Sequence, residues 1–327
     1  MTTLTADEAK TAASPASPGR SGRGDRRGAM KRAGIPYAML APAIVLFALF
    51  MAAPILYTVV MSFQTVKVEG LGLGADSKKL QFAGFANYVN ALIDPEFVGS
   101  VVRVLLYGAI LIPVMLGLAL VFALLLDSRR SRAVRFSRVS IFLPYAVPAV
   151  ISSLLWGFLY LPSVSPLAYL LKGLGMAVPD VLASGSVIFA VANIALWGGV
   201  GFNMIVIYTS LRAIPSDIYE AARIDGASEV QIAWRIKIPI VMPSLIMTGL
   251  FSIIATLQVF AEPTTLKPLT NSISSSWTPL MKVYRDAFIR GDVYSAAATS
   301  VLIALGTFAL SFIFLRVVQR RAFGQED

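Results

Sequence analysis

The sequence predicts an all-α membrane protein, and three observations support that fold class. Of the 327 residues, 57% are hydrophobic and only 14% are charged, whereas ordinary globular domains carry roughly 25% charged residues. Six stretches are long enough to cross a bilayer as helices, which takes roughly 20 residues each, and none of these stretches contains Asp, Glu, Lys or Arg. Because backbone groups in lipid must bond within the protein, and the stretches are too long for barrel strands, we expect six transmembrane helices.

The predicted six-helix domain covers residues 34–322, and the tail before it has a different composition. The spans are 38–63, 104–126, 139–161, 187–211, 240–261 and 294–315. Pro113, Pro144 and Pro148 are expected to kink the second and third spans. Residues 1–33 are rich in Ala, Ser, Gly, Thr and Arg, which predicts a disordered basic tail. A twin-arginine export signal is an alternative there, but the uncharged stretch that follows is longer than a signal peptide needs.

Lys and Arg are distributed unevenly between the segments that connect the spans. The N-terminal tail, residues 127–138, residues 212–239 and the tail after 315 hold seven, five, four and three of them, 19 in all, and the other side holds eight. Because cytoplasmic segments carry the excess of positive charge, we expect a bacterial inner-membrane protein with both termini in the cytoplasm. The net charge of +10 then reflects topology and contact with anionic lipid, and no nucleic-acid partner is predicted.

The sequence lacks the residues that several kinds of chemistry require. The chain has no Cys and no His, which excludes disulfides, Cys/His zinc sites and imidazole acid–base catalysis. It also lacks the GxxxxGK[ST] pattern of a P-loop, so no cofactor or metal is predicted in this chain, and ATP would have to be hydrolysed by another polypeptide. Because ionisable residues are absent from the predicted spans, a proton-driven carrier and a charged substrate are disfavoured, and a neutral sugar or polyol is favoured.

The loop 212–239 is polar and predicts two short helices at the cytoplasmic surface. Asp217 and Glu220 have the spacing of a capping box, as do Ser228 and Gln231. Between them, Asp225 and Gly226 are expected to break the helix, because glycine reaches positive φ at little cost.

Pro239 is expected to end the second of these helices at about residue 238, so neither helix would span the membrane. The small side chains of Ala221 and Ala222 allow another chain to approach closely. A solvated connector would need no such pair of capped helices, which favours a helix that lies in the groove of a partner.

The letters "EAARIDGAS", followed by "IKIP" and Pro243, resemble the EAA loop of bacterial ABC-importer permeases. The segments "LPYAVPAVISSLLWGFLY" and "YRDAFIRGDVYSAAATSVLIAL" resemble the carbohydrate-uptake branch, which includes maltose and glycerol-3-phosphate permeases. The resemblance covers about residues 34–322. One departure is Arg103-Val104, where the family often has Asn-Thr.

This resemblance implies the type I permease fold and a set of partners. The partners would be a second permease subunit in a heterodimer, two copies of a cytoplasmic ATPase that bind ATP and Mg²⁺, and an extracytoplasmic solute-binding protein. By position, Glu220 would pair with a basic group of the ATPase, and Ala221 and Ala222 would allow close packing. Gly226 would provide the bend, Asp225 would brace it, and Pro239 belongs to the apolar–Pro pair that ends the motif.

Polar and aromatic side chains in the fourth and fifth spans are candidates for the substrate path. They are Asn193, Trp197, Asn203, Tyr208, Gln258 and Glu262, with Tyr145 and Trp156 as weaker candidates in the third span. Asn and Gln also bond helix to helix in membranes, and Trp and Tyr also sit at membrane interfaces. Gly198, Gly199 and Gly201 are expected to permit close helix packing.

Two other functions compete with an importer subunit. A stand-alone secondary transporter or channel for a small neutral solute would explain the spans but not the capped helices of the loop 212–239. An intramembrane enzyme would need paired carboxylates or a Ser–Lys dyad inside the membrane, and the predicted spans contain neither.

Overall fold

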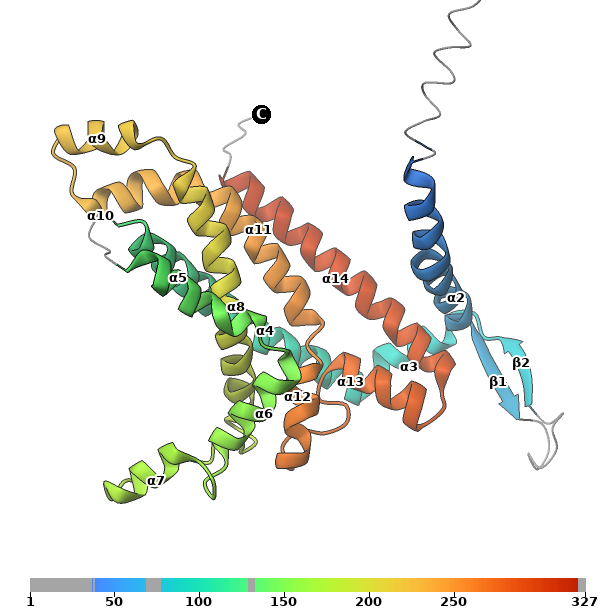
Figure 1. Ribbon diagram of the computed structural model, residues 1–327. Coiled ribbons are helices and arrows are strands. Elements are labelled where there is room, and N and C mark those ends of the chain that lie inside the picture. The colour runs from blue at the N-terminus through green and yellow to red at the C-terminus, as the bar shows by residue number, and fades with distance from the viewer. Residues whose placement is uncertain (1–36, 38, 69–77, 129–132, 323–327) are drawn as a thin grey trace, which may run out of the picture. The chain divides into compact units, whose positions relative to one another are not determined.

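The computed structural model describes residue 37 and residues 39–68, 78–128 and 133–322, and it is mostly helical (Figure 1). The predicted tail, residues 1–33, lies outside the described residues. The chain divides into two units, residues 1–56 and 57–327. Among the described residues, five helices are long and apolar enough to cross a membrane, or six when one bent pair counts as a single span. The predicted all-α membrane class is therefore confirmed.

The first predicted span, 38–63, is a helix over Met39–Ser62. It contains a π-helical turn, η1 (Ala48–Ala52), and continues as α2 (Ala53–Ser62). Pro54 follows this turn closely. A proline has no N–H to bond the carbonyl four residues earlier and its ring crowds that carbonyl. The wider π turn lets the helix continue through the proline.

After the end of α2, the second unit contains a hairpin that the sequence did not predict. The strands β1 (Gln64–Val68) and β2 (Lys78–Phe82) pair in antiparallel register, with Gln64 opposite Phe82. The short helix α3 (Ala86–Ile93) follows. Asn87 donates hydrogen bonds to the carbonyl oxygens of Ser62 and Gln64, which attaches α3 to the start of the hairpin.

The second span is longer than predicted. Its helix, α4 (Pro95–Leu126), starts nine residues before the predicted boundary at 104 and runs through Pro113. Asp94 caps its first turn by accepting a hydrogen bond from the backbone N–H of Glu96 at 2.9 Å. As a result Glu96 and Arg103 belong to a membrane-length helix, although the predicted span excluded them.

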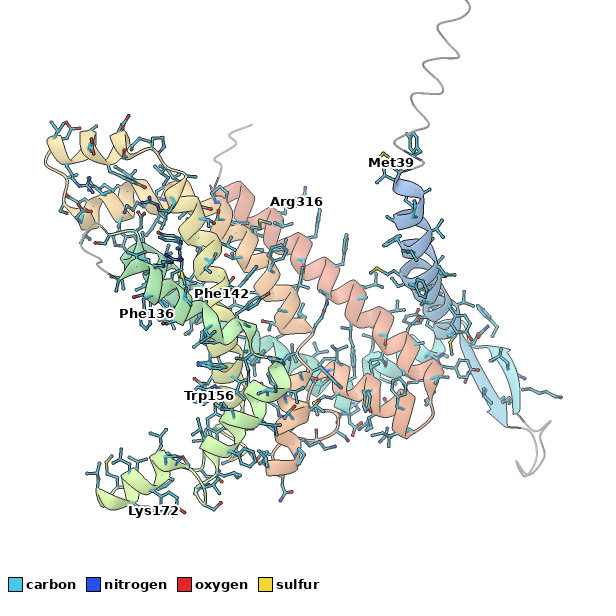
Figure 2. The ribbon with its side chains drawn as sticks, in the orientation of Figure 1. Met39, Phe136, Phe142, Trp156, Lys172 and Arg316 are labelled. Atoms are coloured by element: carbon cyan, nitrogen blue, oxygen red, sulfur yellow. The ribbon has the colours of Figure 1, made fainter. Side chains whose placement is uncertain are left out.

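The third predicted span, 139–161, is wrong as a single helix. It consists of α5 (Val134–Phe142), the 3-10 turn η3 (Leu143–Ala146) and α6 (Ala149–Tyr160), and the two halves are bent by 98°. Figure 2 labels Phe142 before the bend and Trp156 after it. The residue before a proline is pushed out of the helical region. Val147 accordingly has φ −82° and ψ 126° just ahead of Pro148, so the chain breaks where a mild kink was expected.

The fourth span agrees closely with its prediction, since α8 covers Val187–Arg212 against the predicted 187–211. A short helix, α7 (Pro166–Gly173), precedes it. After α8 the loop holds α9 (Ser216–Ile224) and α10 (Glu229–Ile232).

The predicted end of the second loop helix at Pro239 is wrong. From Glu229 the chain runs through α10, the π turn η4 (Ala233–Lys237) and α11 (Ile238–Leu257) without leaving the helical conformation. As in the first span, a π turn directly precedes the proline and accommodates its missing N–H. One helix therefore joins the polar loop to the fifth span, which ends four residues before the predicted 261.

The segment after α11 folds back before the last span. It contains α12 (Ala261–Leu266), the 3-10 turn η5 (Lys267–Leu269), α13 (Pro279–Tyr284) and the π turn η6 (Arg285–Ile289). The last helix, α14 (Val293–Ala322), contains the predicted span 294–315 and extends beyond it. In Figure 1 α11 and α14 lie side by side.

Two clusters of buried apolar side chains hold the second unit together. One lies around Tyr107 and Val191, and the other around Ala123 and Ile207, so α4 and α8 contribute to both. Gly201 of α8 shows why small residues are needed there. A Cβ at that position would overlap the carbonyl oxygen of Ile141 and lie 2.7 Å from the Cα of Phe142, so α5 packs directly on the α8 backbone, as predicted for this glycine.

Candidate functional site

A cavity of about 850 Å³ opens in the second unit where the third segment is broken. Its walls come from α4, η3, the start of α6, α8, the end of α11 and the start of α12. Val147 and Pro148 at the break line it, so irregular backbone is placed against a cavity, a setting in which a membrane protein tolerates it.

The cavity lining combines aromatic rings with hydroxyl and amide groups. The aromatic residues are Tyr107, Tyr145, Phe202, Phe251 and Phe260, and the polar ones are Ser152, Asn203, Ser252, Thr256 and Gln258. Among the described lining residues, Glu262 is the one side chain that carries a formal charge when ionised. Such a surface suits a ligand with many hydroxyl groups, because amides and hydroxyls both donate and accept hydrogen bonds and rings pack on apolar faces.

Half of the predicted substrate-path residues line this cavity. They are Asn203, Gln258 and Glu262, together with the weaker candidate Tyr145. Gln258 also borders a second cavity of about 630 Å³ between α11 and α14.

The other four candidates do not line the cavity, and their contacts are with neighbouring helices. Asn193 donates to the Tyr160 hydroxyl at 2.9 Å, which bonds α8 to α6. Trp197 meets Trp156 edge to face, with ring centroids 6.2 Å apart. Tyr208 is buried in the second cluster, where the Arg138 guanidinium lies 5.5 Å from its ring centre.

Asn203 has the most specific geometry of the lining residues. Its Nδ2 donates to the Gly199 carbonyl at 3.0 Å and approaches the Met115 sulfur at 3.2 Å. Its Oδ1 is buried and has no hydrogen-bond partner among the described residues. A buried acceptor without a partner is costly, so this oxygen would gain from a hydroxyl donor.

The three glycines predicted to serve packing have different environments. Gly201 is in contact with backbone, as described above, whereas a Cβ on Gly199 would meet the flexible end of Met115. Gly198 has open space around its Cα and lines the cavity. Packing therefore requires Gly201 most strongly.

The loop 212–239 forms the second part of the candidate site. Glu220, Ala221 and Ala222 lie on α9, and Asp225 is the C-cap of that helix. Gly226 has φ +81°, which confirms the predicted break at positive φ.

Of the two predicted capping boxes in the loop, one is confirmed. Ser228 accepts from the Gln231 N–H at 3.3 Å, and the Gln231 side chain accepts from the Ser228 N–H at 2.8 Å. The box at Asp217 is wrong, because α9 starts at Ser216 behind an extended Pro215 with no side-chain cap. Asp217 lies inside the first turn, where a carboxylate stabilises the helix through its interaction with the helix dipole.

Exposed apolar side chains accompany the charges of this loop. Ile224 is 87% exposed, Trp234 69% and Val230 67%. The Arg223 Nε donates to Glu229 at 2.8 Å, an ion pair that bridges α9 and α10 across the bend. Large apolar groups beside charged ones are typical of a surface that binds a partner.

A buried contact that the sequence did not predict attaches this loop to the spans. The Lys237 ammonium donates to Asp127, the C-cap of α4, at 2.6 Å, and both side chains are more than nine-tenths buried. The same ammonium lies 4.8 Å from the ring centre of Tyr219 on α9. Burial, together with the charge of Asp127, raises the pKa of the Tyr219 hydroxyl to about 12.

A second set of charges, also not predicted, lies at the opposite end of α4. We refer to it as the ion-pair cluster, and it consists of three carboxylates and three cations: Asp94, Glu96, Lys282, Arg285, Asp286 and Arg290. Lys282 binds Asp286 at 2.5 Å and Asp94 at 2.9 Å, and Arg285 binds Glu96 at 2.5 Å. Nearby, Arg103 donates to the Trp277 carbonyl at 2.7 Å. These contacts fix the segment after α11 to the start of α4.

Membrane-length helices that line a cavity, followed by a loop with two short polar helices, are typical of a membrane transport subunit. The family described as the binding-protein-dependent transport system inner membrane component matches residues 115–323. That range is more than half of the chain, and this chain belongs to that family.

Relatives over nearly the whole chain agree with this assignment. The sn-glycerol-3-phosphate transport system permease protein UgpA of Brucella abortus is 29% identical over 291 residues. That of Yersinia pestis is 27% identical over 294 residues. Each match covers 88% of this chain and 95% of the relative.

Two solved structures share the fold. One is a bacterial ABC transporter involved in the import of the acidic polysaccharide alginate, with a TM-score of 0.77 at 20% identity over 90% of this chain and 99% of that chain. The other is a bacterial alginate ABC transporter in complex with an alginate pentasaccharide-bound periplasmic protein, with a TM-score of 0.78 at 20% identity over 90% and 97% of the chains. The protein is therefore a permease subunit of an ABC importer in the inner membrane, and the stand-alone transporter is not supported.

Proposed function

We propose that this subunit forms half of the path for a neutral sugar or polyol, and that a second permease subunit supplies the other half in a heterodimer. The observation that carries the proposal is the cavity lining, with its aromatic rings, hydroxyls and amides, and with a carboxylate as its charged group. The unpaired Asn203 oxygen supports it, because an acceptor binds a hydroxyl and repels a phosphate or carboxylate. The named relatives act on sn-glycerol-3-phosphate, an anion, so the substrate of this subunit would differ from theirs.

The proposed substrate class can be tested with the solute-binding protein that serves this importer. Its thermal unfolding would be followed with neutral sugars, polyols, sn-glycerol-3-phosphate and alginate oligosaccharides. We expect a raised Tm with a neutral ligand only. In the reconstituted importer, Asn203→Leu should then lower uptake of that ligand several-fold, while Gly198→Ala, which fills open space in the same cavity, should lower it less. A raised Tm with the anions alone would contradict the proposal.

The loop 212–239 is proposed to bind a cytoplasmic ATPase, two copies of which hold ATP and Mg²⁺ for the complex. Both termini of this chain would then also face the cytoplasm, and the chain itself would contribute no ATPase site. The bend at Gly226, the small residues Ala221 and Ala222, and the exposed apolar side chains beside Glu220 support a helix that lies in a groove of the ATPase.

Reversing the charge of Glu220 tests this assignment. We expect Glu220→Lys to leave the subunit inserted and folded, because position 220 is exposed, but to reduce co-purification of the ATPase and to abolish most uptake. Lys172→Glu is the matched control, since it reverses an exposed charge on α7 at the opposite end of α8. Normal ATPase association and normal uptake in the Glu220 variant would refute the docking role.

A further inference from the structure

If α9 binds the ATPase, it has to be connected mechanically to the membrane helices. The Arg223–Glu229 pair connects it to α10, and one further residue contacts both α9 and α4. Lys237 lies in the π turn η4, near the end of the loop 212–239, where the chain continues into α11. Its ammonium reaches Asp127 at the end of α4, and it also lies over the Tyr219 ring of α9. A single cation thus contacts α9 and α4 while its backbone belongs to the helix that continues as α11.

The burial of this contact separates it from ordinary surface ion pairs. Lys237 and Asp127 have side chains that are 8% and 5% exposed, so water screens their attraction little. Arg212 also approaches Asp127, but at 3.9 Å and with a side chain that is 66% exposed, so its attraction is weak. The ring of Tyr219 packs against the second apolar cluster, which excludes water from the ammonium on that side.

We propose that Lys237 is the joint that transmits movement of α9 to α4 and α11. The inference rests on the proposed ATPase coupling through the loop 212–239. When the ATPase displaces α9, the Tyr219 ring and the ammonium move together, and the short bond to Asp127 carries α4 with them. Without the charge, α9 would be attached to α4 by apolar contacts alone, and ATPase movement would reach the spans incompletely.

The first experiment measures coupling in the complete importer, reconstituted in proteoliposomes with its loaded binding protein. Lys237→Met should keep ATPase association and basal ATP hydrolysis, while solute imported per ATP hydrolysed falls several-fold. The double variant Asp127→Asn/Lys237→Met, which leaves no unpaired buried charge, should show the same loss. If the assembled double variant imported as much solute per ATP as the parent, the proposed role of Lys237 would be refuted. Loss of ATPase association would refute it as well.

Tyr219 offers a matched pair of variants for the same assay. Its hydroxyl has no hydrogen-bond partner among the described residues, so Tyr219→Phe should leave import per ATP unchanged. Tyr219→Leu removes the ring that attracts the ammonium and should lower the ratio, though less than Lys237→Met. Equal ratios for the two variants would show that the ring contact transmits nothing.

The second experiment follows the movement itself and separates this proposal from the docking role. The chain has no cysteine, so Leu125→Cys on α4 and Ser216→Cys on α9 accept one spin label each. ATP binding should leave the distance between the labels unchanged in the parent and change it in the Lys237→Met variant. The same response in both would overturn the joint, whereas failure of the parent to bind ATPase would instead refute the proposed function.

Discussion

The two ends of α4 are both attached by buried charges, but in different ways. At its start, the ion-pair cluster joins three carboxylates to three cations, and Asp286 alone contacts Lys282, Arg285 and Arg290. At its end, Asp127 has one short bond, to Lys237, and one long contact, to Arg212.

This difference shows how the number of ion-pair partners of a buried charge limits the movement of the segment attached to it. A charge with several partners cannot follow one of them without leaving the others, so the cluster fixes the segment 258–292 to α4. A charge with one short bond can swing with its partner while the bond stays intact. We therefore interpret the cluster as a static clamp and the Asp127–Lys237 pair as a movable attachment.

The largest effect is expected from breaking the clamp. Asp286→Asn would leave the buried cations Lys282 and Arg285 with one carboxylate partner each, which should destabilise the subunit by about 3 kcal/mol. Thermal unfolding of the purified importer in detergent would measure the change. Asp217→Asn, the same substitution at an exposed position of the loop, should stay within about 0.5 kcal/mol. Equal losses at the two positions would show that the ion pairs of Asp286 do not hold this end of α4.

A moderate effect is expected at the bend of the loop. Gly226→Val forces a β-branched residue to φ +81°, which costs about 1–2 kcal/mol locally, whereas Asn adopts positive φ more readily. We expect the Val variant to lose most uptake while it remains inserted, and Gly226→Asn to retain more of it. If uptake assays showed the two variants equally active, positive φ at this position would be irrelevant.

The clamp should also respond to pH at both extremes. Burial opposes the charge of Asp94, but hydrogen bonds from Lys282 and Glu96 outweigh it and lower the pKa below the usual 3.8. For Lys282 burial is likewise outweighed, by Asp286 and Asp94, and its pKa rises above 10.5. Asp94 therefore stabilises the fold above pH 3.8 and loses this effect as the pH falls through its lowered pKa.

The contribution of Lys282 to stability has the opposite pH dependence. Lys282 stabilises the fold below pH 10.5 and loses the effect as the pH rises through its raised pKa. The contribution of these two residues to the Tm should thus stay constant between pH 3.8 and pH 10.5. Asp94→Asn should reduce the fall on the acid side, and because Asp94 also helps to raise the Lys282 pKa, it should reduce the alkaline fall to a smaller extent, since Asp286 remains. An acid fall of unchanged size in that variant would show that other carboxylates cause it.

The smallest effect is expected from Arg212. Its contact with Asp127 is long and its side chain is mostly exposed, so Arg212→Gln should change stability by no more than about 0.5 kcal/mol and leave import per ATP unchanged. Loss of coupling as large as that of Lys237→Met would mean that Asp127 depends on both cations, and the two ends of α4 would then be alike.

Hydropathy predicted the spans well where a helix is continuous and ends in polar residues. The fourth span was right to one residue, because Arg212 marks its end. The break at Val147 was underestimated, since hydropathy does not show which backbone groups find partners in a cavity. At Pro239 a helix end was predicted but the helix continues, because the π turn that precedes the proline cannot be recognised from residue type.

The candidate site was predicted in part for a similar reason. Local signals revealed the bend at Gly226 and the capping box at Ser228, which depend on residues a few positions apart. The Asp127–Lys237 bond joins residues 110 positions apart, and Glu96–Arg285 joins residues 189 apart, so no local pattern could reveal them. Likewise Asn193 and Asn203 are similar in sequence context, and only the fold shows which one reaches the cavity.

The length of the uninterrupted helix from Glu229 to Leu257 determines how far its tip moves when its base tilts. At 1.5 Å per residue this rod is about 40 Å long. Its base lies in the polar loop, and its tip holds Thr256 and Ala255 at the cavity wall. By simple leverage, a tilt of about 5° at the base shifts the tip by about 3–4 Å, roughly the width of one hydroxyl group. A small stroke of a motor domain is thereby enough to exchange one set of wall contacts for another.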